Sequence, residues 1–149
     1  MTDEHASPKI EVRVADKKDV DAIIELSSKV FRDEAPYTRG MILGQLSAFP
    51  EGQFVAEYEG TIVGHCATMI LTAETAFRPH SWEEISAGGY GRVPAEDGEV
   101  LYGFEVCVDP DYRRLRIGQR LYRMRKELCQ DFELQGIAFA GRMPGYARK

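Results

Sequence analysis

The chain has 149 residues and a formal net charge of −5, with 44% hydrophobic and 29% charged residues. This composition is typical of one globular domain with its own core, and it excludes low-complexity, collagen-like and coiled-coil proteins. An acidic total disfavours a nucleic-acid partner, and no apolar run approaches the ~18 residues that would indicate a membrane partner.

Residues 1–9 have no apolar run of the kind found in a secretory signal, and we expect them to form a flexible tail before a domain at residues 10–149. Three cysteines, Cys66, Cys107 and Cys129, lie in apolar segments without the C-x-x-C or Cys/His spacing of a metal site. They predict buried, reduced thiols in a cytoplasmic protein that binds no metal.

The first half of the domain predicts one strand and two helices. Residues 10–15, IEVRVA, alternate apolar and charged side chains as a half-buried strand does. Residues 19–31 place apolar side chains at helical spacing. Residues 38–49 form a weaker helical stretch, because Gly40 and Gly44 interrupt it.

A hairpin and a long connection follow. Residues 53–73 contain two apolar runs on either side of Glu59-Gly60, a pair suited to a tight turn. Residues 74–98 have no strong periodicity, but Ser81 and Glu84 have the spacing of a capping box that opens one helical turn. A connection of this length is either a functional loop or an ordinary excursion.

The last part predicts a strand, a helix and another strand. The first strand covers residues 99–110, the helix covers residues 117–134, and the last strand follows Gly136. The core stripe of the helix is Ile117, Leu121, Met124, Leu128 and Phe132. A strand–helix–strand crossover is parallel and right-handed, so the element order predicts an α/β (α+β) fold with a mixed sheet and helices on its faces.

The segment VDPDYRRLRIGQRLY, residues 108–122, is the strongest functional signal. A strand end, a proline turn and a helix start meet there, so free backbone N–H groups and the positive end of the helix dipole point to one place. That arrangement suits a phosphate group, and Gly118 would let such a ligand approach the backbone closely. Seven basic residues surround this helix start: Arg113, Arg114, Arg116, Arg120, Arg123, Arg125 and Lys126.

Two interpretations of these cations remain open. Arginines beside the positive end of a helix are unfavourable unless an anion docks there, which favours a phosphate-bearing ligand. Alternatively, the later cations belong to a solvated face with salt bridges, since Arg123 and Glu127 are four residues apart.

This segment resembles the acetyl-CoA-binding motif of the GNAT N-acetyltransferase superfamily. In that motif, R/Q-x-x-G-x-G/A follows a strand and opens a helix; Arg113 matches its first position and Gly118 its last. Arg116 stands where the family has its middle glycine, and it is strained if this position needs a positive φ. The resemblance implies a GNAT-like mixed sheet flanked by helices, with acetyl-CoA as cofactor and coenzyme A as product.

The resemblance also assigns the residues that bind the coenzyme. The strand would pair through its backbone with the pantetheine arm and polarise the thioester carbonyl, and the helix start would hold the pyrophosphate. The residues are Val106, Cys107, Val108, Arg113, Arg114, Arg116, Ile117, Gly118, Gln119 and Arg120.

A narrower resemblance is to the GNAT domain fused ahead of a carbon–nitrogen hydrolase domain in some bacterial proteins. It rests on SWEEISAGGYG, LYGFEVCVDPDYRRLRIGQRLYRMRKELC and AGRMPGY. A GNAT fold continues past GYARK with a final helix and a closing hairpin, so the domain is expected to be incomplete at its C-terminus. The protein partners left open are a second copy, giving a homodimer, and a carbon–nitrogen hydrolase domain.

Acetyl transfer needs a neutral amine, a polarised thioester and a proton for the leaving thiolate. Glu105 and Tyr102 are the catalytic candidates, and regular alternation would direct them to opposite faces, so that only one faces the cleft. Trp82, Glu83 and Glu84 could line the acceptor site, where carboxylates favour a cationic amine. Trp82 could instead anchor its own loop.

These features predict an N-acetyltransferase that transfers the acetyl group of acetyl-CoA directly to an amine of a small molecule or peptide. The alternative is a non-catalytic acyl-CoA-binding module that regulates a carbon–nitrogen hydrolase. Turnover with an amine separates the two.

Overall fold

The computed structural model describes residues 10–31 and 37–139, and for Arg113 and Arg114 it describes the backbone only. The tail predicted at residues 1–9 and the C-terminal residues 140–149 lie outside the described residues. In chain order the elements are β1 (Ile10–Val14), η2 (Lys17–Asp19), α1 (Val20–Val30), α2 (Arg39–Ala48), η3 (Pro50–Gly52), β2 (Gln53–Tyr58), β3 (Thr61–Leu71), α3 (Ala73–Phe77), α4 (Trp82–Ile85), β4 (Val100–Val108), η4 (Pro110–Leu115), α5 (Ile117–Asp131) and β5 (Gly136–Phe139). The labels η mark short 3-10 helices.

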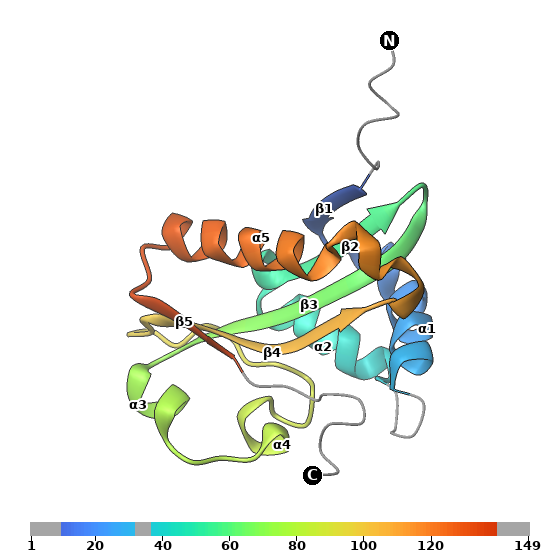
Figure 1. The fold of residues 1–149 in the computed structure, drawn as a ribbon. Coiled ribbons are helices and arrows are strands. Elements are labelled where there is room, and N and C mark those ends of the chain that lie inside the picture. The colour runs from blue at the N-terminus through green and yellow to red at the C-terminus, as the bar shows by residue number, and fades with distance from the viewer. Residues whose placement is uncertain (1–9, 32–36, 140–149) are drawn as a thin grey trace.

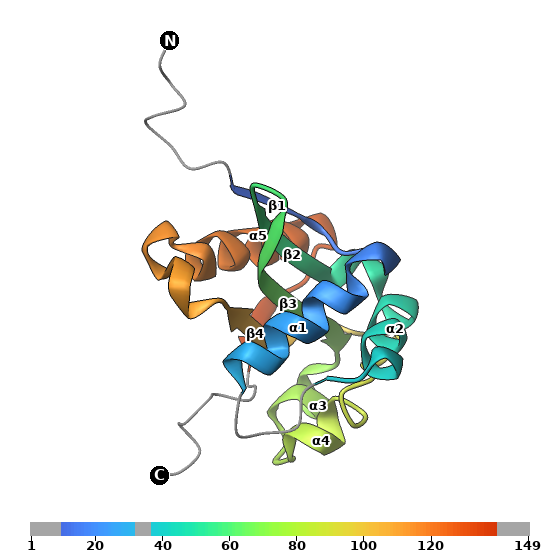
Figure 2. The same cartoon turned by 90° about the vertical axis from the view of Figure 1, so that its right-hand side faces the viewer.

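The described strands form one mixed sheet in the order β1-β2-β3-β4-β5. β1 to β4 pair antiparallel, whereas β4 and β5, which are joined through α5, pair parallel. Helix α5 covers one face of the sheet, and α1 to α4 lie on the other (Figure 1). After a 90° turn the strands are seen between α5 and the pair α1 and α2 (Figure 2). The mixed sheet flanked by helices that the sequence predicts is confirmed.

Alternation along the strands builds an apolar core on each face. On the α5 face, Cys66 and Leu101 pack with Leu121 of the helix. On the opposite face, Met69 and Tyr102 belong to a second cluster with α3 and α4. Burying a large apolar side chain contributes about 1.5–3 kcal/mol, so a register slip that exchanged these two sets would be strongly unfavourable.

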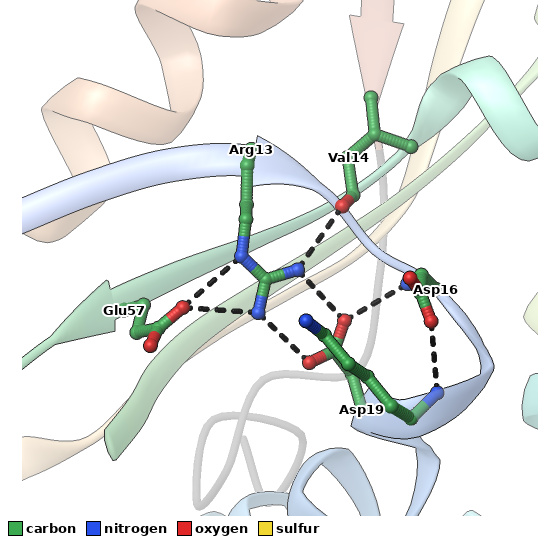
Figure 3. Close-up of polar contacts among 6 residues, drawn as sticks. Arg13, Val14, Asp16, Asp19 and Glu57 are labelled. Carbon is green, nitrogen blue, oxygen red and sulfur yellow. Dashed lines mark hydrogen bonds and ion pairs between the residues drawn. The ribbon is translucent and has the colours of Figure 1, made fainter. Parts of the chain in front are cut away.

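An ion-pair cluster fixes the connection from β1 to α1 (Figure 3). The guanidinium of Arg13 donates to both carboxylate oxygens of Asp19, each at 2.9 Å, and to Glu57 of β2 at 3.0 Å. Asp19 also accepts from the backbone N–H of Asp16 at 2.9 Å. The arginine lowers the pKa of Asp19, so charge as well as packing holds the start of α1 at the edge of the sheet.

The hairpin between β2 and β3 forms as predicted. Glu59 and Gly60 have φ values of 50° and 84°. Two consecutive positive φ values are those of a type I′ turn, whose twist matches that of the strands it joins.

The long connection is more ordered than the sequence indicates. The capping box between Ser81 and Glu84 opens α4 as expected, whereas α3, capped by Thr72, is not predicted. In the loop after α4, the ring of Tyr90 packs directly against Gly44 of α2. A Cβ on this glycine would lie only 2.9 Å from the ring. This glycine weakens the helix prediction for α2 and also makes room for the ring.

Helix α5 ends at Asp131 rather than at the predicted residue 134, and its buried stripe differs from the prediction. Phe132 lies beyond the helix end and is 42% exposed, because the chain turns at Glu133, which has a φ of 55°. Arg125, grouped by the sequence with the surface cations, is 4% exposed. The buried side of α5 therefore contains a charged side chain.

Candidate functional site

The second half of β4 has a free edge. Its first four residues pair with β5, and no described strand pairs with residues 104–108 on that side. Asp109 donates its backbone N–H to Val63 of β3 at 2.9 Å. By antiparallel alternation, the peptide groups of Val106 and Val108 then point away from β3. They present hydrogen-bonding groups to the space beyond the end of β5.

A β-bulge at Phe104 decides which side chains share a face. Glu105 and Gly103 lie opposite consecutive residues of β3, so Phe104 is the extra residue. Tyr102 lies among the side chains of α3 and α4, and Glu105 points to the same face, where it contacts Tyr37. The prediction that Tyr102 and Glu105 point to opposite faces is wrong, because the bulge reverses the alternation between them.

The turn after β4 is tied to α1. Lys29 of α1 donates to buried Asp109 at 3.0 Å and to Asp111 at 2.8 Å. Asp109 also accepts from the backbone N–H of Asp111 at 2.9 Å. The ammonium group of Lys29 lowers the pKa of Asp111. It forms ion pairs with both Asp109 and Asp111. Lys29 therefore positions the turn that leads into α5.

The start of α5 has the geometry of an anion site. Arg116 is its N-cap residue, with φ 57° and ψ 41°, and its side chain makes no cap hydrogen bond. These values lie in the left-handed region, which is unfavourable for a residue other than glycine, so the backbone at Arg116 is strained. Ile117 is buried, Gln119 is exposed, and a Cβ on Gly118 would meet nothing within 4 Å. The backbone N–H groups of a first helical turn have no acceptor within the helix.

The cations near this helix start whose side chains the structure describes have no ion-pair partner within residues 10–31 and 37–139. In the described part of the chain, no ion pair involves the side chains of Arg116, Arg120 or Arg123. Arg120 donates to the backbone oxygen of Leu115 at 3.3 Å. The pair between Arg123 and Glu127 that a salt-bridged surface requires does not form, which favours the anion interpretation.

The strand residues predicted to bind the coenzyme point in different directions. Cys107 is buried against Leu26 and Phe31 of the α1 region, and Val108 packs at the edge of the core under α5. Val106 is 36% exposed. A ligand along this edge would therefore meet backbone groups and the side chain of Val106.

Glu105 is a buried carboxyl group on the face opposite α5. It is 1% exposed, and its Oε1 accepts from the hydroxyl of Tyr37 at 2.9 Å. The Tyr37 ring meets His65 edge-on, with 6.4 Å between ring centroids. Burial lowers the pKa of His65 to about 4, so this histidine contributes no charge near pH 7.

The side chains of the three predicted acceptor residues, Trp82, Glu83 and Glu84, have different environments. Trp82 donates its indole N–H to the carbonyl oxygen of Phe104, at the bulge, at 2.7 Å. Glu83 is exposed. Glu84 accepts from the backbone N–H of Ser81 at 3.3 Å and lines a cavity. The contact of Trp82 favours its interpretation as an anchor between α4 and β4.

A cavity of about 420 Å³ lies between the end of β3, α3, α4 and the following loop. Its charged and titratable lining side chains are Arg78, His80, Glu84 and Arg92. Nε2 of His80 is 3.4 Å from the hydroxyl of Tyr102, and burial raises the pKa of that tyrosine. The sequence does not single out Arg78, His80 and Arg92, since they are scattered over a connection without periodicity. The length of that connection is the signal that could have indicated them.

Arg125 is buried between α5 and the β4–β5 pair. Its guanidinium carbon lies 4.8 Å from the Phe139 ring centroid and 5.4 Å from that of Tyr122. Nε and Nη1 have no hydrogen-bond partner in the described residues. Cation–π contacts contribute about 0.5–2 kcal/mol, whereas burying an ion costs several kcal/mol. The described contacts therefore do not offset the burial of this charge.

Three observations on the described residues concern thiols, clusters of metal-binding side chains and membrane-spanning helices. Cys66 and Cys129 are buried and free, as predicted, and Cys107 is also buried. No group of three or more His, Cys, Asp or Glu side chains that could hold a metal ion occurs in residues 10–31 and 37–139. Within the same ranges, no helix has both the length and the apolarity needed to cross a membrane.

A strand that ends in a turn and leads directly into a helix start rich in arginine is the order of elements in the motif that the sequence resembles. The model of the acetyltransferase (GNAT) family matches residues 19–145, and the chain belongs to this family.

Two relatives from Bacillus subtilis (strain 168) are similar to the chain over most of its length. A probable hydrolase, YhcX, is 40% identical over 138 residues, which are 93% of this chain and 27% of the relative. An uncharacterized N-acetyltransferase, YkwB, is 27% identical over 139 residues, which are 91% of this chain and 62% of the relative. The chain thus spans less than two thirds of either relative.

Solved structures share the fold. The loading GNATL domain of CurA from Lyngbya majuscula superposes with a TM-score of 0.76 and 18% identity, covering 94% of this chain and 68% of that one. A GNAT family acetyltransferase from Brucella melitensis, in complex with acetyl-CoA, superposes with a TM-score of 0.55 and 21% identity, covering 93% and 79%.

Proposed function

We propose that the chain is an acyl-CoA-dependent N-acyltransferase that transfers the acetyl group of acetyl-CoA directly to an amine. The proposal rests on the free edge of β4, which leads through a fixed turn into a helix start where Arg116 and Arg120 make no ion pair in the described residues. Membership of the GNAT family supports acyl transfer in general. The acetyl-CoA in the related Brucella melitensis structure supports an acyl-CoA as the donor.

In this proposal the α5 start holds the pyrophosphate of the co-substrate. Backbone N–H groups of Ile117, Gly118 and Gln119 donate to phosphate oxygens, and the helix dipole adds partial positive charge. Arg116 and Arg120 supply charge-assisted contacts, together with Arg113 and Arg114. The pantetheine arm then extends along Val106, Cys107 and Val108, so that the thioester end is directed toward the bulge.

Glu105 is the proposed general base. In the reaction the amine nitrogen bonds to the acyl carbon, the carbon–sulfur bond breaks, one proton leaves the nitrogen, and one proton reaches the sulfur. A carboxylate that lies on the acceptor side of the bulge can take the first of these protons. Tyr102, which lies on the same face and keeps its proton because burial raises its pKa, is the proposed source of the second.

Calorimetric titration with acetyl-CoA tests the binding part of the proposal. The parent is expected to bind with a Kd on the order of micromolar, and the double variant Arg116→Ala, Gly118→Glu is expected not to bind. Arg39→Ala is the matched control, since this arginine begins α2, on the face of the sheet opposite α5, and pairs with Asp21. A folded parent that does not bind acetyl-CoA would contradict the proposal.

A second function is favoured by one observation. The relative with 40% identity is a probable hydrolase, and the chain spans 27% of it. This supports a non-catalytic acyl-CoA-binding module that regulates a carbon–nitrogen hydrolase domain. Release of coenzyme A with an amine acceptor supports the transferase. Tight binding of acetyl-CoA without such release from any amine in a broad panel supports the regulatory module.

The buried free thiols of Cys66 and Cys129 also support a reducing compartment. We therefore place the protein in the cytoplasm as part of the proposal.

A further inference from the structure

We infer that the cavity between α3, α4 and the end of β3 is the acceptor pocket, and that it selects amines that carry a carboxylate. The inference rests on the proposed acyl transfer and names the substrate class for it. Cations that line the cavity, rather than the acidic residues expected from the sequence, determine this class.

The position of the cavity fits an acceptor. The proposed coenzyme site begins at the α5 start and follows β4 back to the bulge at Phe104. Tyr102, two residues further along β4, is in contact with His80, which lines the cavity. Because the bulge places Tyr102 and Glu105 on one face, the cavity and the proposed base lie on the same side of the sheet. Figure 1 shows α3 and α4 on this side, opposite α5.

The charge of the cavity favours an anionic group. Two arginines, Arg78 and Arg92, and one carboxylate, Glu84, line it. Glu84 accepts the N–H of Ser81 in its capping box, which leaves it less able to bind a substrate cation. In the described residues, Arg78 makes no ion pair. The cavity is therefore cationic within a chain whose total charge is −5.

The guanidinium of Arg92 is held in place by the loop. It donates through Nε to the carbonyl oxygen of Ile85 at 2.8 Å and through Nη2 to that of Glu84 at 2.6 Å. Neither carbonyl carries a charge, so the positive charge of Arg92 is fixed beside the cavity but not neutralised. Such a fixed cation can bind a carboxylate with little further loss of side-chain freedom.

The same cations assist the chemistry of the acceptor. An amine attacks only when it is neutral, and nearby positive charge lowers the pKa of an ammonium group. An acceptor whose carboxylate binds the arginines therefore places its amine where deprotonation is favoured. The nitrogen then bonds to the acyl carbon while the carbon–sulfur bond breaks; as in the proposed function, the extra proton on nitrogen passes to Glu105 and the leaving sulfur takes the proton of Tyr102.

The test compares two amines of nearly the same shape, leucine and leucinamide, which differ in the carboxylate. Affinity of each for the chain is measured by titration, and kcat/KM for acetyl transfer is measured by release of the thiol of coenzyme A. The two amines differ in their own pKa, so the ratio of their values in a variant is compared with the ratio in the parent.

Three variants test whether the charge of the cavity determines the affinity for leucine. Arg78→Gln is expected to lower the affinity for leucine about tenfold and to leave leucinamide unchanged. Glu84→Gln removes the negative charge but keeps a residue that completes the capping box, and it is expected to raise leucine affinity about threefold. Arg39→Gln, which lies outside the cavity lining and pairs with Asp21, is expected to change neither amine.

Each outcome decides between the two proposals. Equal binding of both amines by the parent, or a preference for leucine that survives Arg78→Gln, would overturn the acceptor inference. If the parent binds acetyl-CoA and acetylates leucinamide as well as leucine, the proposed function stands and the inference fails. Absence of acetyl-CoA binding would instead contradict the proposed function.

Discussion

The backbone at Arg116 offers a direct test of how this helix start works, through the substitution Arg116→Gly. The residue has φ 57° and ψ 41°, a conformation that disfavours a non-glycine residue by roughly 1–2 kcal/mol. Glycine relieves that strain but loses about 0.5–1 kcal/mol more backbone entropy on folding. The expected net gain in the free energy of unfolding is about 0.5–1 kcal/mol, or ~2 °C in Tm for a chain of this size.

Arg116→Ala is the matched variant, because it removes the same charge and keeps the strain. Both variants should lose about fivefold in affinity for coenzyme A, since each lacks one charge-assisted contact worth about 1 kcal/mol net. Because both variants lose the same unfavourable charge beside the helix dipole, the glycine variant should unfold at a higher temperature than the alanine variant.

Thermal unfolding and calorimetric titration of the three proteins are the assays. If Arg116→Gly were no more stable than Arg116→Ala, the left-handed backbone would not be a source of strain. If both variants bound coenzyme A as tightly as the parent, the charge of Arg116 would play no part in the anion site.

Three further predictions concern Gly44, His65 and Arg125. Gly44→Ala should destabilise by about 1–2 kcal/mol in denaturant unfolding, because its Cβ would lie 2.9 Å from the Tyr90 ring; Gly118→Ala, which meets no atom, should stabilise instead, and equal effects would refute the Tyr90 contact. His65 has a folded pKa of about 4, below its unfolded value near 6.5, so protonation favours the unfolded chain. Stability should therefore fall by about 3 kcal/mol as the pH drops from 6.5 through 4, and urea unfolding of His65→Gln should lack this component of the pH dependence. Arg125→Met should leave the free energy of unfolding unchanged or raise it by about 1–2 kcal/mol; a loss of more than 2 kcal/mol would show that the guanidinium has a favourable partner.

Local signals in the sequence predicted most of the fold. The capping box of Ser81 and Glu84, the turn at Glu59-Gly60 and the alternation of the strands each depend on neighbouring residues, and each was found where expected. The helix start with Arg116 was also found, because the motif that marks it is contiguous.

The rest depends on contacts between distant residues, which one sequence does not display. The bulge at Phe104 arises from the register with β3, although Gly103 beside it is a residue type that often marks a bulge. The helical spacing of α5 does not reveal that Arg125 takes a core position. The cavity residues Arg78, His80 and Arg92 come together only when α3, α4 and the loop fold over the sheet.

The bulge in β4 also divides the strand into two parts with independent pleats. A residue gained or lost before Phe104 would turn over the side chains that face α3 and α4 and leave the edge at Val106 and Val108 unchanged. The same change after Phe104 would alter that edge alone. Under the proposed function, the coenzyme edge and the acceptor side of the strand can therefore diverge separately, so that one mode of coenzyme binding can be combined with different acceptors.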